Sequence, residues 1–227
     1  MTAHPERPDL SSVPLFALPN VVLFPRAVLP LHIFEERYKA MTADALAGDR
    51  QVAMALLRPG WEKDYYHRPE IEPVVCVGTI LSHERLPDGK YNFLLQGHTR
   101  ARVVLELPGT GDPPYRVARL EPITETHGLE IDLQEERQRL AGLFRATALG
   151  GTPMGRQFRQ LLTGTARTGD VADLVAFNYL DDVSLKQALL EEADVRRRVR
   201  RVIEAVEQNQ PSLQLAYLRE SADPELN

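Results

Sequence analysis

The chain has 227 residues, a formal net charge of −5, 43% apolar residues and 26% charged residues. These proportions are typical of a globular protein and exclude a disordered, collagen-like or disulfide-rich chain. The acidic balance also disfavours nucleic acid as a partner. The single cysteine, Cys76, lies in an apolar run, which excludes an internal disulfide and a cysteine-based zinc site and indicates a buried thiol.

Neither a membrane helix nor a signal peptide is predicted. The sequence has no run of about 18 apolar residues. Residues 1–9 are polar and contain two prolines, where a signal peptide would need a charged start and an apolar core. We therefore expect a cytoplasmic protein that makes no membrane contact.

Residues 10–128 predict a β-rich lobe with one inserted helix. Short apolar runs at residues 13–18 and 21–24 are each closed by a proline, which favours strands. From Ile33 the apolar residues recur at helical spacing up to Gly48, a typical helix stop. One helix is therefore expected among the strands.

The strand pattern continues after this helix. Asp88-Gly89 lies between two apolar runs and predicts a tight hairpin. Because antiparallel strands of this number must close or cover their edges, we expect a small antiparallel β-barrel. The further strands are predicted at residues 51–57, 74–86, 91–96, 101–107 and 115–120.

Residues 129–210 predict an α-helical lobe, since prolines become rare and apolar residues recur at helical spacing. Asp170, Ser184 and Asp194 each precede such a run and are predicted N-caps. Residues 211–227 are polar and are expected to form a disordered tail. The predicted fold class is α+β, a β-barrel followed by a helical bundle.

Segments spread over residues 13–208 carry a family resemblance. Proline-bracketed strands run into a Phe-Glu helix start within residues 13–38. Further matching segments are Val77-Gly78-Thr79-Ile80, Leu86-Pro87-Asp88-Gly89, residues 97–102, residues 172–176 and residues 189–197. Together they resemble the substrate-binding domain at the N-terminus of Lon-type proteases. The resemblance implies a PUA-like β-barrel, a helical bundle, and recognition of unfolded or peptide-like protein segments.

The parts of a Lon protease that perform chemistry are not expected in this chain, which ends at Asn227 before an ATPase or a peptidase. The nearest approach to a phosphate loop, residues 164–169, is followed by Asp170 where a phosphate-binding lysine would stand. We expect a helix-to-helix loop there. The predicted protein is a stand-alone binding module that passes polypeptides to a separate protease or chaperone.

No catalytic or metal-binding constellation is predicted, and no cofactor. The six histidines are scattered without the spacing that places two ligands on one helix face. His32 lies beside Glu35 and Glu36, but a structural role at the strand-to-helix junction is favoured. No serine lies in a nucleophile elbow, and Ser184 and Lys186 would face different sides of a helix.

The polar, Pro/Gly-bounded segment 58–69 holds the only tryptophan and two tyrosines. Large rings in a polar loop suit an interaction surface, because they bury much area at little entropic cost. The predicted binding residues are Trp61, Tyr65, Tyr66 and Arg68. The alternative is that these rings cover the end of the barrel.

One basic cluster occurs, at residues 196–198, Arg200 and Arg201. Glutamates at helical spacing pair with part of it, so a solvated helix face is expected. The alternative is an acidic partner or RNA bound through Arg197 and Arg201.

Overall fold

The computed structural model describes residues 9–65, 67–108, 114–126, 129–145 and 148–222. The chain divides into two compact units, Met1–Ile123 and Thr124–Asn227. The first holds the strands and the second is helical, so the fold class is α+β as predicted.

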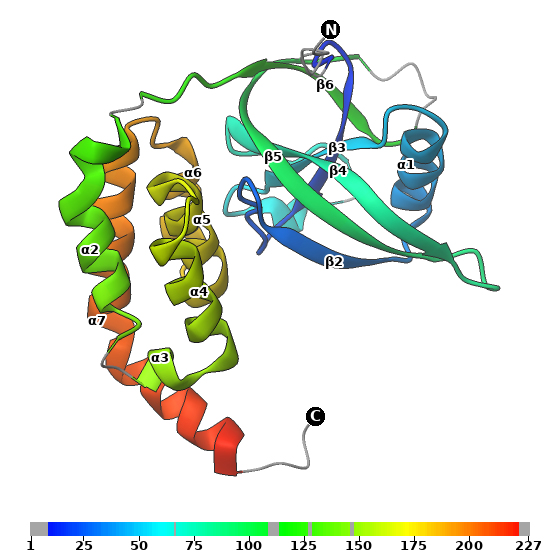
Figure 1. Ribbon diagram of the computed structural model, residues 1–227. Helices are drawn as coiled ribbons and strands as arrows, with labels where there is room; N and C mark the ends of the chain where they lie inside the picture. Colours follow the sequence, from blue (N-terminus) through cyan, green and yellow to red (C-terminus); the bar gives the residue numbers. More distant parts are fainter. Residues whose placement is uncertain (1–8, 66, 109–113, 127–128, 146–147, 223–227) are drawn as a thin grey trace, which may run out of the picture. The chain divides into compact units, whose positions relative to one another are not determined.

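The first unit contains six strands in the order β2-β5-β4-β3-β1-β6, and β6 also pairs with β5 (Figure 1). Hydrogen bonding therefore runs around a ring of β5, β4, β3, β1 and β6, and β2 extends the sheet from the outer edge of β5. The elements are β1 (Val13–Leu18), β2 (Val28–Ile33), α1 (Glu36–Ala47), β3 (Gln51–Leu56), the 3-10 helix η1 (Trp61–Lys63), β4 (Val74–Arg85), β5 (Tyr91–Glu106) and β6 (Arg116–Pro122).

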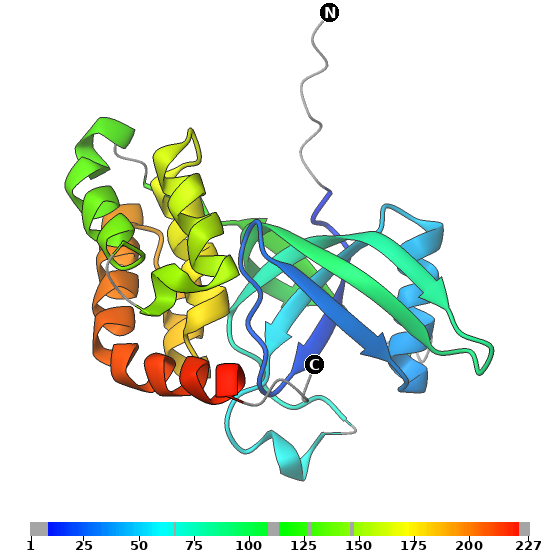
Figure 2. The same cartoon turned by 60° about the horizontal axis from the view of Figure 1, so that its bottom comes forward.

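The ring closes because β5 is long and bends. Its 16 residues pair with β2 and β4 in the first half and with β4 and β6 in the second. Register shifts mark bulges in both the β4 and the β6 pairings, and such bulges bend a strand. Figures 1 and 2 show the β4–β5 hairpin extending beyond the rest of the unit.

One pair departs from the expected all-antiparallel barrel, because β1 and β3 run parallel. A parallel pair needs a crossover connection, and residues 19–50 provide it with β2 and α1. Within this crossover, residues 21–24 were wrongly predicted as a strand. Leu23 and Phe24 are instead fully buried in a connector without strand pairing.

Gly97 allows this connector to lie against β5. Its backbone N–H donates to Ala27 O at 2.9 Å, and Arg26 N–H donates to Gly97 O at 2.8 Å. A Cβ at position 97 would lie 2.3 Å from Phe24 O and 2.9 Å from the Cys76 sulfur. Only glycine fits this approach.

One cluster in the core of the first unit consists of small and branched residues, most of them on strands. Helix α1 is fastened to the sheet by Tyr38, whose hydroxyl donates to Ala17 O at 2.8 Å. Helix α1 begins at Glu36 rather than at Ile33, because Ile33 is the last residue of β2 and pairs with Tyr91. The residues of this cluster are Leu10, Val13, Leu15, Ala17, Ala53, Ala55, Leu57, Val75, Val77, Ala101, Ala118 and Leu120.

The second unit is a bundle whose interior includes an aromatic cluster. The rings of Phe144, Phe158 and Tyr179 lie with centroids 5.3 to 5.7 Å apart. The elements are the 3-10 helix η2 (Glu130–Leu133), α2 (Gln134–Gly142), α3 (Ala148–Gly151), α4 (Pro153–Thr163), α5 (Thr168–Tyr179), α6 (Val183–Glu191) and α7 (Val195–Ala222).

Two of the three predicted helix caps differ in the structure. Asp182, not Ser184, caps α6 by accepting from Leu185 N–H at 3.0 Å. Helix α5 begins at Thr168, so Asp170 lies inside its first turn. Asp194 does cap α7 and accepts from Arg197 N–H at 2.9 Å.

Helix α7 has 28 residues and ends at Ala222, so its backbone is helical within residues 211–222, where the sequence suggested a disordered tail. Pro211 removes one hydrogen bond. The leucine, glutamine and alanine residues that follow are good helix formers, which explains the continuation.

Candidate functional site

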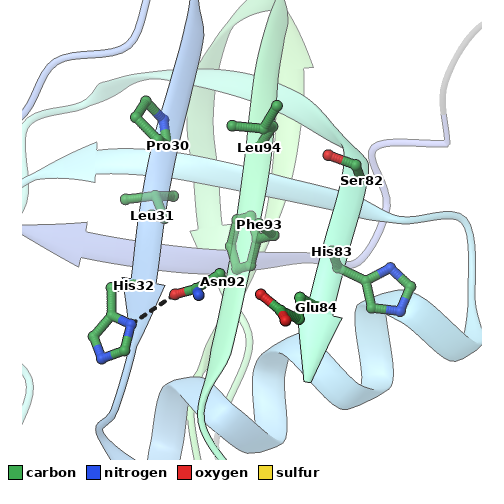
Figure 3. A pocket seen from close by; sticks show the side chains of 9 residues that line it. All are labelled: Pro30, Leu31, His32, Ser82, His83, Glu84, Asn92, Phe93 and Leu94. Atoms are coloured by element: carbon green, nitrogen blue, oxygen red, sulfur yellow. Dashed lines mark hydrogen bonds between the residues drawn. The ribbon is translucent and has the colours of Figure 1, made fainter. Parts of the chain in front are cut away.

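A hollow of about 430 Å³ lies on the sheet of the first unit, across β2, β5 and β4 (Figure 3). Strand register builds it. Pro30, Leu94 and Ser82 are cross-strand neighbours, and His32, Asn92 and Glu84 form the next such row on the same face. The lining is completed by the intervening row, Leu31, Phe93 and His83.

The exposed face beside and within the hollow is partly apolar. Val28 on β2 is 39% exposed, and Leu94 on β5 is 38% exposed. Pro30, which pairs with Leu94, is also exposed. Phe34, just after β2, is 61% exposed. Isolated apolar residues on a surface are ordinary, whereas a group of them on one sheet face is a candidate interaction surface.

The polar part of the hollow begins with His32. Its Nδ1 lies at hydrogen-bond distance, 2.7 Å, from Asn92 Oδ1 (Figure 3). The His32 ring also stacks on Phe34, with centroids 6.2 Å apart. His32 lies near the end of β2, shortly before α1 begins at Glu36, and it is exposed.

Glu84 provides the carboxylate of the hollow. It is exposed, lies opposite Asn92 on β4, and has no cation within ion-pair distance among the described residues. The neighbouring Arg85 belongs to the opposite face of the strand, where its guanidinium lies 5.8 Å from the Tyr91 ring centroid. The hollow therefore presents uncompensated negative charge.

The open edge of β2 is blunted. Within the described part of the chain β2 pairs only with β5, which leaves its other edge unpaired. Pro30 lies in the middle of β2 and has no N–H to donate. Proline on an edge strand opposes the addition of another strand, so side chains of the sheet face are better placed for recognition.

The predicted aromatic binding residues are partly held by the fold. The rings of Trp61 and Tyr65 meet edge to face with centroids 5.3 Å apart, and both pack half-buried against the core of the first unit. Arg68 is exposed in the same loop. Tyr66 lies outside the described residues.

Tyr65 anchors this loop to the start of α1. Its hydroxyl donates to Glu35 Oε1 at 2.6 Å, and Arg37 donates to Tyr65 O at 3.2 Å. The Arg37 guanidinium lies 4.7 Å from the Tyr65 ring centroid and 4.6 Å from that of Tyr38. Burial and then the bond to Glu35 raise the pKa of Tyr65, and burial raises the pKa of Tyr38 to about 12.

The basic cluster of α7 is occupied by internal acceptors. Arg197 is 73% exposed, with Glu192 at 3.9 Å and Asp194 at 3.7 Å, and Arg201 donates to Ala188 O at 3.5 Å. Arg196 and Arg200 both pair with Glu136. Each of these four arginines therefore has an acceptor within the helical unit.

Arg198, in the same cluster, is not part of a solvated face. It is 1% exposed, lies 2.6 Å from Glu125 Oε1, and is 3.0 Å from Asp173 Oδ1. The helical period explains this, because Arg198 lies three residues after Val195 and four before Val202, both buried. The sequence analysis missed this buried charge pair.

The loop between α4 and α5 directs carbonyl oxygens toward an arginine and is not arranged to bind a phosphate. Arg137 of α2 donates to the carbonyl oxygens of Leu162 at 2.9 Å and Ala166 at 2.7 Å, and also to those of Leu161 and Gly164. A phosphate loop turns N–H groups inward, whereas this loop turns carbonyls toward a guanidinium. It is a helix connector, as predicted.

The described residues contain neither a metal-binding cluster nor a helix able to cross a membrane. No group of three or more His, Cys, Asp or Glu side chains there is placed to hold a metal ion. None of the helices described is both long and apolar enough to cross a membrane.

Comparisons with known proteins agree with the predicted resemblance. Residues 12–208 match the ATP-dependent protease La (LON) substrate-binding domain. Lon protease 2 of Sorangium cellulosum is 32% identical over 208 residues, which cover 89% of this chain and 25% of that protein. Lon protease of Dictyoglomus thermophilum is 28% identical over 194 residues, 84% of this chain and 23% of that protein. The chain thus spans about a quarter of the length of these relatives.

Solved structures share the fold. The N-terminal domain of Mycobacterium avium complex Lon protease aligns with a TM-score of 0.67 and 17% identity, over 87% of this chain and 98% of that one. A Lon N-terminal domain protein from Xanthomonas campestris aligns with a TM-score of 0.59 and 22% identity, over 86% and 98%. With a family match over residues 12–208 and the six-stranded sheet and helical bundle described above, the chain belongs to the Lon substrate-binding domain family.

Proposed function

We propose that this chain is a non-catalytic module that binds unfolded or peptide-like protein segments through the hollow on β2, β5 and β4. The observation that carries the proposal is the group of exposed apolar side chains, Val28, Pro30 and Leu94, beside polar groups on one sheet face. Membership of a substrate-binding family supports it.

Exposed apolar side chains select for unfolded partners. Folded proteins bury most of their large apolar residues, whereas an unfolded segment offers them. Each apolar side chain that leaves water contributes roughly 1.5–3 kcal/mol at full burial, and immobilising the segment offsets much of this. We expect dissociation constants on the order of micromolar, suited to brief contact before a segment passes to a protease or chaperone.

Binding is favoured over hydrolysis by the spacing of the strands. Ser82, His32 and Glu84 share the hollow and are the residue types of a hydrolytic triad. However, β2 and β4 lie on opposite sides of β5, which separates their side chains by about 10 Å. A triad needs hydrogen-bond contact between nucleophile and base, so these three residues are not one.

The loop with Trp61, Tyr65 and Arg68 is a second candidate surface. Phe34 stacks on His32 of the hollow, and the next residue, Glu35, accepts from Tyr65. These contacts connect the hollow to the loop. If the loop takes part, Trp61→Ala weakens polypeptide binding, and the fluorescence of Trp61, the only tryptophan, shifts to the blue when a polypeptide is added. An unchanged affinity and spectrum would leave Trp61 only its packing role.

The hollow itself is tested by a matched pair of variants. Leu94 and Leu105 both lie on β5 and are 38% and 51% exposed, but only Leu94 lines the hollow. The affinity for a fluorescently labelled, permanently unfolded polypeptide is measured by anisotropy. We expect Leu94→Asp to weaken binding at least tenfold and Leu105→Asp to leave it within twofold. Equal effects of the two substitutions would remove the hollow as the binding site.

A further inference from the structure

The hollow combines an apolar wall with one uncompensated carboxylate, and this combination indicates what it prefers. Resting on the proposed function, we infer that the hollow selects extended segments in which a large apolar residue and a lysine or arginine are separated by one residue. The apolar side chain contacts Leu94 and Pro30, and the basic side chain reaches Glu84.

The spacing follows from sheet geometry. Leu94 lies opposite Ser82, and Glu84 is two residues further along β4 on the same face. Such diagonal neighbours lie about 7 Å apart. In an extended segment, side chains of residues i and i+2 point the same way and lie about 6.6 Å apart. An apolar residue seated at Leu94 therefore brings the side chain two positions away to Glu84, while the residue between faces solvent.

The charges around Glu84 determine whether the hollow attracts a basic or an acidic side chain. Its carboxylate has no cation within ion-pair distance in the described part of the chain. Arg85 points to the other face and is engaged by Tyr91. Lys90, near the hairpin, pairs with Asp88 at 2.7 Å. A basic side chain is therefore attracted, and an acidic one is repelled.

The ion pair with Glu84 should change the affinity only modestly, because Glu84 is exposed. Ion pairs at exposed sites change an equilibrium about two- to fivefold, and salt weakens them. The apolar contact thus decides whether a segment binds, and Glu84 ranks the segments that do.

The test uses the full chain and four labelled peptides that share one background and carry a single leucine. They hold lysine, glutamine or glutamate two residues after the leucine, or lysine directly after it. At low salt we expect the first peptide to bind about two- to fivefold more tightly than the glutamine peptide. The glutamate peptide should bind more weakly, and lysine at the adjacent position should bring no gain.

Variants assign the effect to Glu84. Glu84→Gln should abolish the preference for the lysine peptide over the glutamine peptide, and Glu84→Lys should reverse it. Glu121→Gln, which removes an exposed carboxylate on β6, is the matched control and should keep the preference. A lysine preference that survives Glu84→Gln, or one that ignores lysine position, would overturn the inference.

Failure of this inference is distinguishable from failure of the proposed function. If Leu94→Asp weakens every peptide equally and charge has no effect, the hollow binds polypeptides but Glu84 does not rank them. If Leu94→Asp leaves the affinity for every peptide unchanged, the hollow is not the binding site. The proposed selectivity of the hollow is then wrong as well.

Discussion

Arg198 and Asp173 form an ion pair of 3.0 Å in which each side chain is 1% exposed. The arginine comes from α7 and the aspartate from α5, so the pair fixes the packing of these two helices. Glu125 and the carbonyl oxygen of Glu192 also accept from Arg198, each at 2.6 Å. The core of the helical unit thus contains a compensated charge cluster.

Removing one partner of this pair leaves a buried charge. We expect Arg198→Met to lower the free energy of unfolding by about 3–5 kcal/mol, because Asp173 stays buried with less compensation. The double variant Arg198→Met/Asp173→Leu should recover most of that loss. Urea unfolding followed by circular dichroism measures both. A double variant less stable than Arg198→Met alone would contradict this account.

Gly97 should tolerate no side chain. A Cβ at position 97 would lie 2.3 Å from Phe24 O, so Gly97→Ala forces the connector away from β5. We expect the free energy of unfolding to fall by about 1–3 kcal/mol, as at other overpacked sites. Gly142→Ala is the control, since a Cβ there meets nothing within 4 Å. Thermal unfolding should show a lower Tm for the first variant and not for the second.

Glu136 should give the helical unit an acid-dependent stability. Burial alone would raise its pKa, but its own backbone hydrogen bond and the hydrogen bond and charge of Arg200 outweigh burial, so the pKa lies below its ordinary value. A carboxyl whose pKa is lower in the folded state stabilises the protein above the unfolded pKa, about 4.3. That contribution is lost as pH falls through the folded pKa.

The corresponding variant is Glu136→Gln. Its free energy of unfolding should lie below that of the parent at pH 7, and the difference should shrink as pH falls below about 4. Denaturant titrations at a series of pH values provide the measurement. A constant difference at every pH would argue against the proposed linkage.

RNA retention should be weak and should not depend on Arg197 and Arg201 of α7. Arg197 and Arg201 already have internal acceptors, so the variant Arg197→Gln/Arg201→Gln should behave as the parent does. Filter binding with a labelled single-stranded RNA at low and moderate salt checks this. Salt-sensitive retention that the double substitution weakens would favour the RNA alternative.

Local signals in the sequence predicted elements better than partners. Asp88-Gly89 predicted a hairpin, and Gly89 has φ of 81° with Leu86 N–H donating to Lys90 O at 2.8 Å. The parallel pairing of β1 with β3 was not predicted. The spacing of apolar residues indicates that a segment is a strand, but not which strand it pairs with. The strand and helix patterns predicted a β-rich lobe followed by a helical lobe, and the resemblance to a known family implied the same architecture.

The hollow could not be read from local pattern. His32 and Asn92 are 60 positions apart and meet only through the β2–β5 register. Arg198 was likewise grouped with its exposed neighbours, although its place in the helical period could have indicated burial. Trp61 and Tyr65 were predicted as binding residues because aromatic residues in a polar loop are a local signal.

The most direct test of the central claim is a titration of the ¹⁵N-labelled chain with an unfolded polypeptide, followed by backbone amide chemical shifts. The account predicts that the largest shift changes fall in residues 28–34, 82–85 and 91–96, on the three strands around the hollow and at Phe34. Changes confined to the helical unit, or to residues 103–106 of β5, would contradict it.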